Sequence, residues 1–429
     1  MKKYFVLFLA LTFVLSFAAF AVADDGGADS VRSMAPGAHV TIGGDARVEG
    51  VWHSNYQPAS TGSTDGNFNK SMDYDTRYWR QRLRLKITGD VGNGIQMRSR
   101  LSTDNDIWHG TSNTRANSYN GGGVEIDYMY LHVPVGNFVV DTGLMKRSFG
   151  NKWHLWDQAR DTFQVTTNVG DTQIGVFTDK VDDTSDDSTC SGDPCIYPNA
   201  TGGENLEDQD NYGLFINHTS GDFAAGLLVI LEDDNAGTPD VSGTEYSAYF
   251  NTSVGAIGIA AEVAMTTGDI SGNEDSADNN RVGGFIAAMT DVGAIGVTVA
   301  GMVAKDGYSA DSHFTPSVFF GTDNPTAISN VASASASTTW AVYARADMPI
   351  NNDLSVSGTL LYADLENLGS ELGNTTGDTG KENATEIDLG LVYKLGDNAK
   401  WSVDFGYLIP DDITAADDAA FAARQKIEV

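Results

Sequence analysis

The sequence predicts an all-β fold: a transmembrane, antiparallel, up-and-down β-barrel of 16 to 18 strands with short periplasmic turns and long acidic extracellular loops. Three observations predict it: an export signal at the N-terminus, strand-length runs in which apolar and polar residues alternate, and a regular exchange of short turns with long polar connections. Alternation with a period of two marks strands that have one apolar and one polar face, as the wall of a water-filled barrel requires.

The N-terminus has the layout of a cleavable signal peptide. Lys2 and Lys3 precede an apolar run over residues 4–20, and Ala21-Val22-Ala23 then offers small residues to a signal peptidase. We therefore expect residues 1–23 to be a signal peptide, 24–39 an N-terminal periplasmic segment and 40–429 the transmembrane barrel. No later stretch reaches the about 18 uninterrupted apolar residues of a transmembrane helix, so any membrane span must consist of strands.

The connections alternate in length along the barrel region. Eight of them are short and rich in Gly, Asn, Asp and Pro, the residues that tight turns select: 89–94, 134–137, 168–170, 220–222, 254–256, 291–293, 349–353 and 396–399. Nine are long and polar: 54–75, 104–123, 147–161, 179–210, 233–243, 268–280, 306–338, 365–384 and 410–419. This alternation gives 18 strands, or 16 because the run 163–167 is short and the last strand is weak. An even number places both termini on the periplasmic side.

The strands themselves have two different faces. Ile257, Ile259 and Val263 share one face of their run, whereas Gly258 and Glu262 share the other. An apolar outer face and a small or polar inner face are typical of a barrel with a wet interior.

Charge and cysteine content narrow the choice of partners. The formal net charge is −32, from 58 acidic and 26 basic residues, which argues against binding to nucleic acid. The two cysteines, Cys190 and Cys195, lie in one acidic connection. Because export leads to an oxidising compartment, we expect them to form a disulfide within that loop.

The acidic connections favour divalent cations as partners, although most such charge runs are only solvated surface. Carboxylate oxygens suit Ca²⁺ and Mg²⁺, which could bridge these loops to anionic lipopolysaccharide. No run has the twelve-residue spacing of a calcium loop, so the sequence identifies no metal ligand. It also contains no Gly-x-Ser-x-Gly, His-Glu-x-x-His or Gly-x-x-x-x-Gly-Lys motif, and we expect neither an enzyme nor a cofactor.

The segment from Tyr130 to Gly150, YLHVPVGNFVVDTGLMKRSFG, resembles Gram-negative outer-membrane porins, as do the signal peptide and the strand and turn alternation. The resemblance implies an outer-membrane channel for passive diffusion of small hydrophilic solutes and ions, a homotrimer, contact with lipid and lipopolysaccharide, and a loop that folds into the pore. Such porins commonly end in an aromatic residue, whereas this chain ends in Val429.

One strand and its neighbour carry a row of basic residues, which we call the basic ladder: Arg80, Arg82, Arg84, Lys86, Arg98 and Arg100. Each strand presents its basic residues on a single face, and a hairpin at 89–94 would place Arg82 and Arg84 near Arg100 and Arg98. An Arg or Lys facing lipid at the bilayer midplane costs about 2 to 4 kcal/mol, so the ladder should line the lumen.

Two interpretations of the basic ladder stay open. In the first, wall carboxylates such as Glu125 and Asp127 on the next strand pair with it and only satisfy its charge. In the second, the ladder faces an acidic loop across a constriction, so that solutes cross a transverse field. The candidate constriction loop is 147–161, which is either an ordinary surface loop or an inward fold, and its candidate residues are Trp153, Trp156, Asp157, Arg160 and Asp161.

Three functions are therefore compatible with the sequence. The first is a diffusion porin, because sixteen to eighteen strands enclose an aqueous channel. The second is a solute-selective channel in which the basic ladder binds anionic groups. The third is a barrel without transport activity, such as a scaffold or an envelope anchor.

Overall fold

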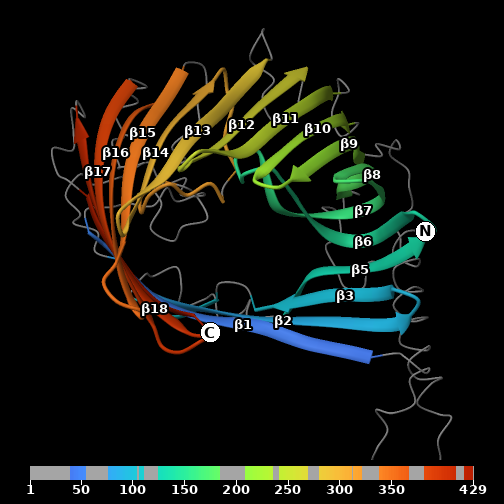
Figure 1. The fold of residues 1–429 in the computed structure, drawn as a ribbon, viewed down its shortest axis with the longest axis horizontal. Coiled ribbons are helices and arrows are strands. Elements are labelled where there is room, and N and C mark those ends of the chain that lie inside the picture. The colour runs from blue at the N-terminus through green and yellow to red at the C-terminus, as the bar shows by residue number, and fades with distance from the viewer. Residues whose placement is uncertain are drawn as a thin grey trace, which may run out of the picture.

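The protein forms a closed antiparallel β-barrel in a computed structural model (Figure 1). The structure describes residues 39–54, 76–103, 106–110, 124–183, 208–234, 241–268, 280–311, 313–320, 338–366, 381–411 and 420–428. Among these residues, no helix is long and apolar enough to cross a membrane. The predicted disulfide between Cys190 and Cys195, the signal peptide and most of the acidic connections lie outside the described residues.

The strands follow one another around the barrel in chain order. They are β1 (His39–Ser54), β2 (Thr76–Gly92), β3 (Ile95–Ser102), β4 (Asp106–Gly110), β5 (Glu125–Val135), β6 (Phe138–Phe149), β7 (Leu155–Val169), β8 (Thr172–Asp183), β9 (Asp208–Ser220), β10 (Phe223–Asp234), β11 (Val241–Val254), β12 (Ile257–Gly268), β13 (Arg281–Val292), β14 (Ile295–Lys305), β15 (Thr338–Pro349), β16 (Leu354–Glu366), β17 (Lys381–Lys394), β18 (Lys400–Asp411) and β19 (Ala420–Glu428).

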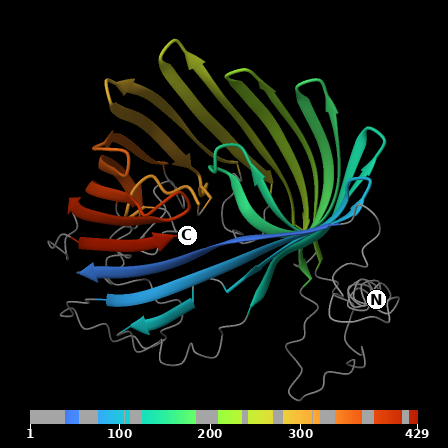
Figure 2. The ribbon, with the colours of Figure 1, turned by 60° about the horizontal axis from the view of Figure 1, so that its bottom comes forward.

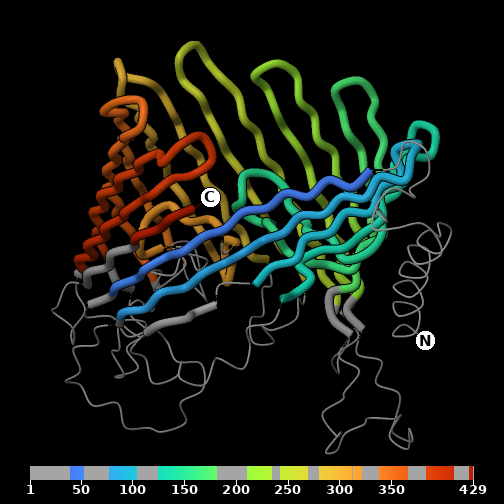
Figure 3. Tube along the Cα trace, turned by 90° about the horizontal axis from the view of Figure 1, so that it is seen from below, coloured from blue at the N-terminus to red at the C-terminus, as the bar shows by residue number. Residues whose placement is uncertain are grey.

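The strand count agrees with the upper value that the sequence predicts. Both β3 and β4 pair with β2, so they occupy one position in the wall and the barrel has 18 strand positions. The last strand, which is weak in the sequence, closes the barrel by pairing antiparallel with both β18 and β1. In Figure 2 the red C-terminal strands lie beside the blue N-terminal ones, and Figure 3 shows β1 and β2 crossing the wall obliquely.

All eight predicted short turns connect consecutive strands. Gly136 and Gly221 open two of them with φ of 62° and 58°, a conformation that glycine adopts without steric cost. The predicted faces are also confirmed, because Ile257 and Val263 are exposed on the outside whereas Glu262 between them is buried.

The predicted long connection 147–161 is wrong. β6 continues to Phe149 and β7 begins at Leu155, so only residues 150–154 separate the two strands. A strand pair that leaves the membrane wall no longer needs an apolar outer face. Polar residues therefore follow one another in this part of the sequence, and the pattern resembles a loop.

Apolar side chains fill part of the barrel interior. The largest buried cluster joins inner-face residues of β12 to β18 to Phe314, Val318, Phe319 and Phe320. These four belong to the start of the connection between β14 and β15, which enters the barrel, and we call residues 306–320 the inward segment. Phe319 and Phe320 are fully buried, so this side of the interior is filled by apolar side chains and not by water.

Candidate pore constriction

The connected ends of β6 and β7 leave the wall and cross the interior. Pairing between β5 and β6 stops at Met129 and Leu144, whereas pairing between β6 and β7 continues to Phe149 and Leu155. Gly143, at the point of departure, has a φ of 128°, and a Cβ there would lie 2.5 Å from the carbonyl oxygen of Met129. We call residues 145–157 the hairpin end.

Glu262 of β12 holds the tip of the hairpin end. Its carboxylate accepts hydrogen bonds from the backbone N–H groups of Asn151, Trp153 and His154, and from the hydroxyl of Ser247. The carboxylate is almost fully buried, so these donors replace its hydration. The hairpin end is thereby fastened to the wall across the barrel from β5.

Trp153 joins the hairpin end to the inward segment. Its side chain is fully buried, with ring centroids 4.8 Å from Phe314, 5.5 Å from Phe285 and 6.0 Å from Tyr308. Its carbonyl oxygen accepts a hydrogen bond of 2.7 Å from the N–H of Asp311. The apolar contact and the backbone hydrogen bond together hold the hairpin end against the inward segment.

Asp311 adds a second set of contacts to the hairpin end. Its carboxylate accepts hydrogen bonds from the backbone N–H of Trp156 at 3.0 Å and from the side chain of Gln158 at 3.1 Å. Burial raises the pKa of Asp311, but these bonds and those from His313 lower it further, so the pKa lies below its usual value. The carboxylate therefore stays charged and keeps its donors in place.

The inward segment is anchored to the far wall by two carboxylates of β17. Glu386 accepts hydrogen bonds from the N–H of Phe319 at 2.8 Å and the hydroxyl of Ser317 at 2.6 Å. Asp388 accepts one from the N–H of Val318 at 3.2 Å. Both carboxylates are buried on the inner face of β17. The inward segment is therefore held by the hairpin end near Asp311 and by β17 near Phe319.

The basic ladder lies on the inner face of β2 and β3, and its role in lining a pore stays a prediction. Arg82 and Arg84 are mostly covered, whereas Leu83 and Leu85 between them are exposed on the outer face. Arg80 donates a hydrogen bond of 2.6 Å to Glu49 of β1. Arg82 lies 3.5 Å from Asp45 of the same strand. Arg80 and Arg82 are therefore paired with β1 and not with β5.

Arg98 and Lys86, the ladder residues nearest the short turn between β2 and β3, have different neighbours. Arg98 donates to the side-chain oxygen of Gln96 at 2.8 and 2.9 Å and to the hydroxyl of Tyr130 at 3.4 Å, and all of these partners are neutral. Lys86 is exposed, and no ion pair joins it to another residue in the described part of the chain. These two cations thus keep charge that no described carboxylate neutralises.

Two details of the predicted ladder need correction. Arg100 lies opposite Lys86, and Arg98 opposite Thr88, because β2 continues to Gly92 and only residues 93 and 94 separate it from β3, so the turn is shorter than the expected 89–94. Arg84 and Arg100 nevertheless meet, because both contact Asp127. Glu125, the other expected partner, is exposed and has no ion pair with any residue that the structure describes.

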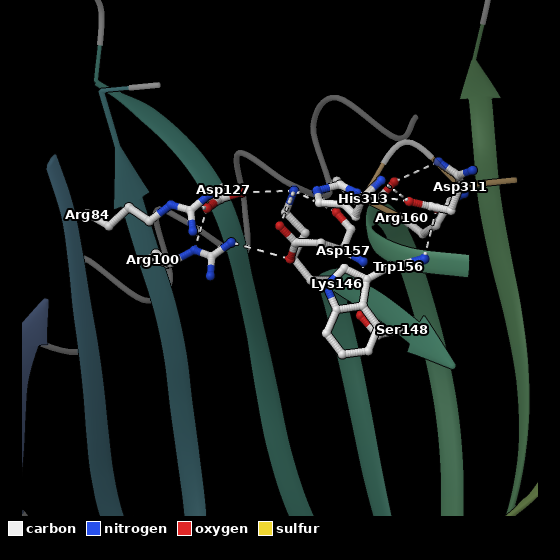
Figure 4. Close-up of polar contacts among 11 residues, drawn as sticks. Arg84, Arg100, Asp127, Lys146, Ser148, Trp156, Asp157, Arg160, Asp311 and His313 are labelled. Carbon is white, nitrogen blue, oxygen red and sulfur yellow. Dashed lines mark hydrogen bonds and ion pairs between the residues drawn. The ribbon is translucent and has the colours of Figure 1, made fainter. Parts of the chain in front are cut away.

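Asp127 and the hairpin end meet at the ladder (Figure 4). Asp127 forms ion pairs with Arg100 and with Lys146, the latter at 3.0 Å, and it lies 3.9 Å from Arg84. Asp157 of the hairpin end lies 3.5 Å from Arg100. The hairpin end thus touches the basic wall at one side and the packed interior at the other.

The candidate constriction residues divide into two groups. Trp153, Trp156 and Asp157 lie in the hairpin end, inside the barrel. Arg160 and Asp161 lie further along β7, where Arg160 donates to the side chain of Gln158 at 2.7 Å and Asp161 is exposed. Their role in a constriction stays a prediction.

Several residues of this site do not follow from the sequence pattern. Arg147 contacts Asp179 at 2.6 Å and places its guanidinium 3.4 Å from the centre of the Phe177 ring. The sequence does contain a signal for Glu262, because it is the charged residue on the inner face of an otherwise apolar strand. Lys146 and Asp311 carry no such signal. Among the described residues, no group of three or more metal-ligating side chains is placed to hold a metal ion.

No protein-family model matches the chain, and no curated protein matches its sequence. Solved structures do match. A variant of OccD1 (OprD) has a TM-score of 0.56 and 10% identity, covering 96% of this chain and 97% of that one. A BenF-like porin from Pseudomonas fluorescens has a TM-score of 0.57 and 10% identity, covering 90% and 98%. OccK2 (OpdF) from Pseudomonas aeruginosa, in complex with glucuronate, has 0.56 and 12%, covering 92% and 98%.

The chain therefore has the fold of Gram-negative outer-membrane porins, as the sequence resemblance implied. In particular, it is similar over nearly its whole length to the OprD-type channel proteins of Pseudomonas.

Proposed function

We propose that this protein is a channel of the bacterial outer membrane that admits small hydrophilic solutes carrying a carboxylate. One observation carries the proposal: the basic ladder lines the inner face of β2 and β3 and descends from the long connections toward the short turns. Guanidinium groups match carboxylates in geometry as well as in charge. A row of them offers an anionic solute successive sites along its path.

The distribution of the remaining side chains supports the same path. Apolar packing and the inward segment occupy the interior along β12 to β18, so solutes would pass along the basic wall, beside the point where the hairpin end touches it. Arg98 and Lys86 are the best candidates for direct contact, because the described hydrogen-bond partners of Arg98 are neutral and Lys86 is exposed. Glucuronate, which is bound to the similar OccK2 structure, is a suitable test solute.

The affinity must be low for transport. A site that binds too tightly would delay release, so conduction requires several weak sites and not one strong site. Exposed ion pairs contribute about 0.2 to 1 kcal/mol each, which suits this requirement.

The proposal is tested by flux into liposomes that contain the purified protein. We expect glucuronate flux to saturate with concentration and to exceed glucose flux, and we expect Arg98→Gln to lower the glucuronate preference several-fold. Lys305→Gln is the matched control, because Lys305 is exposed and its ion pair within the described part of the chain is with the adjacent Asp306 at 3.3 Å. Equal, unsaturated flux of both solutes would instead indicate a diffusion porin, and absence of flux would indicate a scaffold or envelope anchor.

Further expectations belong to the same proposal. They are removal of residues 1–23 on export, assembly as a homotrimer, contact with lipopolysaccharide through divalent cations on the acidic connections, and absence of catalysis. The layout of residues 1–23 supports the first, the porin resemblance supports the second, and the net charge of −32 supports the third.

A further inference from the structure

Two carboxylates share one cluster of cations where the hairpin end meets the wall. Arg84, Arg100 and Lys146 supply three positive charges, and Asp127 and Asp157 supply two negative ones (Figure 4). Arg100 also lies over the ring of Tyr128, 5.0 Å from its centroid. The cluster therefore keeps an excess of one positive charge beside the proposed path of the solute.

The two carboxylates are not equivalent. Asp127 belongs to wall strand β5, contacts Lys146 at 3.0 Å and Arg100 more closely still, and has 11% of its side chain exposed. Asp157 belongs to the hairpin end, lies 3.5 Å from Arg100 and 3.9 Å from Lys146, and is 24% exposed. Short, covered contacts make Asp127 a permanent partner of the cations, whereas the longer contacts of Asp157 are easier to break.

The backbone presents the Asp157 side chain to the cluster. Its φ is 50°, a left-handed conformation that few residues other than Gly, Asn and Asp adopt readily. Its N–H donates to the hydroxyl of Ser148 at 2.9 Å, and its carbonyl oxygen accepts from Lys146 at 3.0 Å. The main chain is thus held while the carboxylate can turn away by rotation of its own side chain.

We propose that Asp157 stands in for the carboxylate of the solute. In the empty channel it occupies the anion-binding positions on Arg100 and Lys146, and an entering carboxylate displaces it. As the solute leaves, Asp157 returns and competes for the same cations. This role rests on the proposed function and adds to it the residue that sets the affinity of the site.

The competition has a measurable consequence. Without the carboxylate of Asp157, an anionic solute no longer has to displace it from Arg100 and Lys146. The solute should therefore bind more tightly, and its flux should saturate at a lower concentration. The lost contacts are weak and partly exposed, so we expect the half-saturation concentration of glucuronate to fall about two- to fivefold. Glucose flux should not change, because glucose carries no charge.

The experiment compares Asp157→Asn with the wild type in liposome flux of glucuronate. Asn tolerates positive φ and keeps the shape of the side chain. Asp222→Asn is the matched control, since this carboxylate lies in the short turn between β9 and β10, is exposed and forms no ion pair within the described part of the chain. Asp157→Gly, which relieves the backbone and removes the carboxylate, provides a second variant if the first is poorly folded by heat-modified gel mobility.

The outcomes separate the two proposals. A lower half-saturation concentration in Asp157→Asn or Asp157→Gly, with Asp222→Asn unchanged, supports the role of Asp157. Saturable wild-type flux with the same half-saturation concentration in folded Asp157 variants overturns this role alone. Unsaturated wild-type flux overturns the proposed function, and the role of Asp157 with it.

Discussion

His154 is the residue at which the hairpin end, the inward segment and the wall meet. One ring nitrogen lies 3.3 Å from the hydroxyl of Tyr308, and the other lies 3.3 Å from the carboxylate of Glu245 on β11. Its backbone N–H donates to Glu262 on β12. Burial lowers the pKa of His154, but the contact with Glu245 and the charges of Glu245, Glu262 and Asp311 raise it more, so the pKa lies above its usual value.

A pH dependence of the channel follows from His154. Since its pKa is raised in the docked state, protonation stabilises docking fully below about pH 6.5, and this contribution is lost as the pH rises through the raised pKa. We expect brief current steps, which report undocking of the hairpin end, to become more frequent in planar-bilayer recordings as the pH is raised from about 6 through the raised pKa of His154. His154→Gln should remove most of this dependence. A wild-type trace that is constant over the range would contradict the expectation.

At the scale of elements, the inward segment is accommodated by glycines of the wall. A Cβ on Gly406 of β18 would lie 2.8 Å from Cβ of Val318, and one on Gly283 of β13 would lie 2.2 Å from the ring of Tyr308. Glycine generally weakens a strand, and such positions often mark a close approach of another chain segment. The wall is therefore shaped to receive the inward segment at both of its ends.

Gly406→Val tests this arrangement. Valine suits a strand, so β18 should still form, but its side chain would overlap Val318 and displace the inward segment. We expect conductance to increase up to several-fold and discrimination between solutes to decrease, with heat-modified gel mobility retained. Gly358→Val is the matched control, because a Cβ there meets nothing closer than 3.8 Å. Equal conductance of the two variants would show that the inward segment does not restrict the channel.

At the scale of the whole molecule, the barrel interior has two unlike sides. The basic ladder and its partners lie along β1 to β5, and the apolar cluster with the inward segment lies along β12 to β18. The hairpin end connects them, since it contacts Arg100 through Asp157 and Glu262 through its tip. This division places the cationic side chains on one side and the apolar packing that fills the interior on the other.

Salt should therefore weaken selection without changing the width of the channel. The reach of an exposed charge shrinks from about 30 Å at about 0.01 M salt to about 3 Å at about 1 M. We expect the preference for glucuronate over glucose in liposome flux to fall as salt rises, with glucose flux constant. A preference that is independent of salt would mean that shape and not charge selects the solute.

The sequence predicted the features that depend on neighbours along the chain. The turn at Gly136 and the alternating faces around Glu262 each follow from a few consecutive residues. The pairing of Arg100 was predicted incorrectly, because the turn between β2 and β3 consists of residues 93 and 94 alone, and the position of a turn decides which residues face each other across the hairpin.

What the sequence by itself determined is the barrel, because lipid on one side and water on the other impose an alternation that every wall strand must repeat. Only the tertiary structure decided how the interior is filled. The hairpin end and the inward segment meet no lipid, so no periodic pattern marks them. Their positions depend on single carboxylates such as Glu262 and Glu386, more than sixty residues away from the groups that they bind.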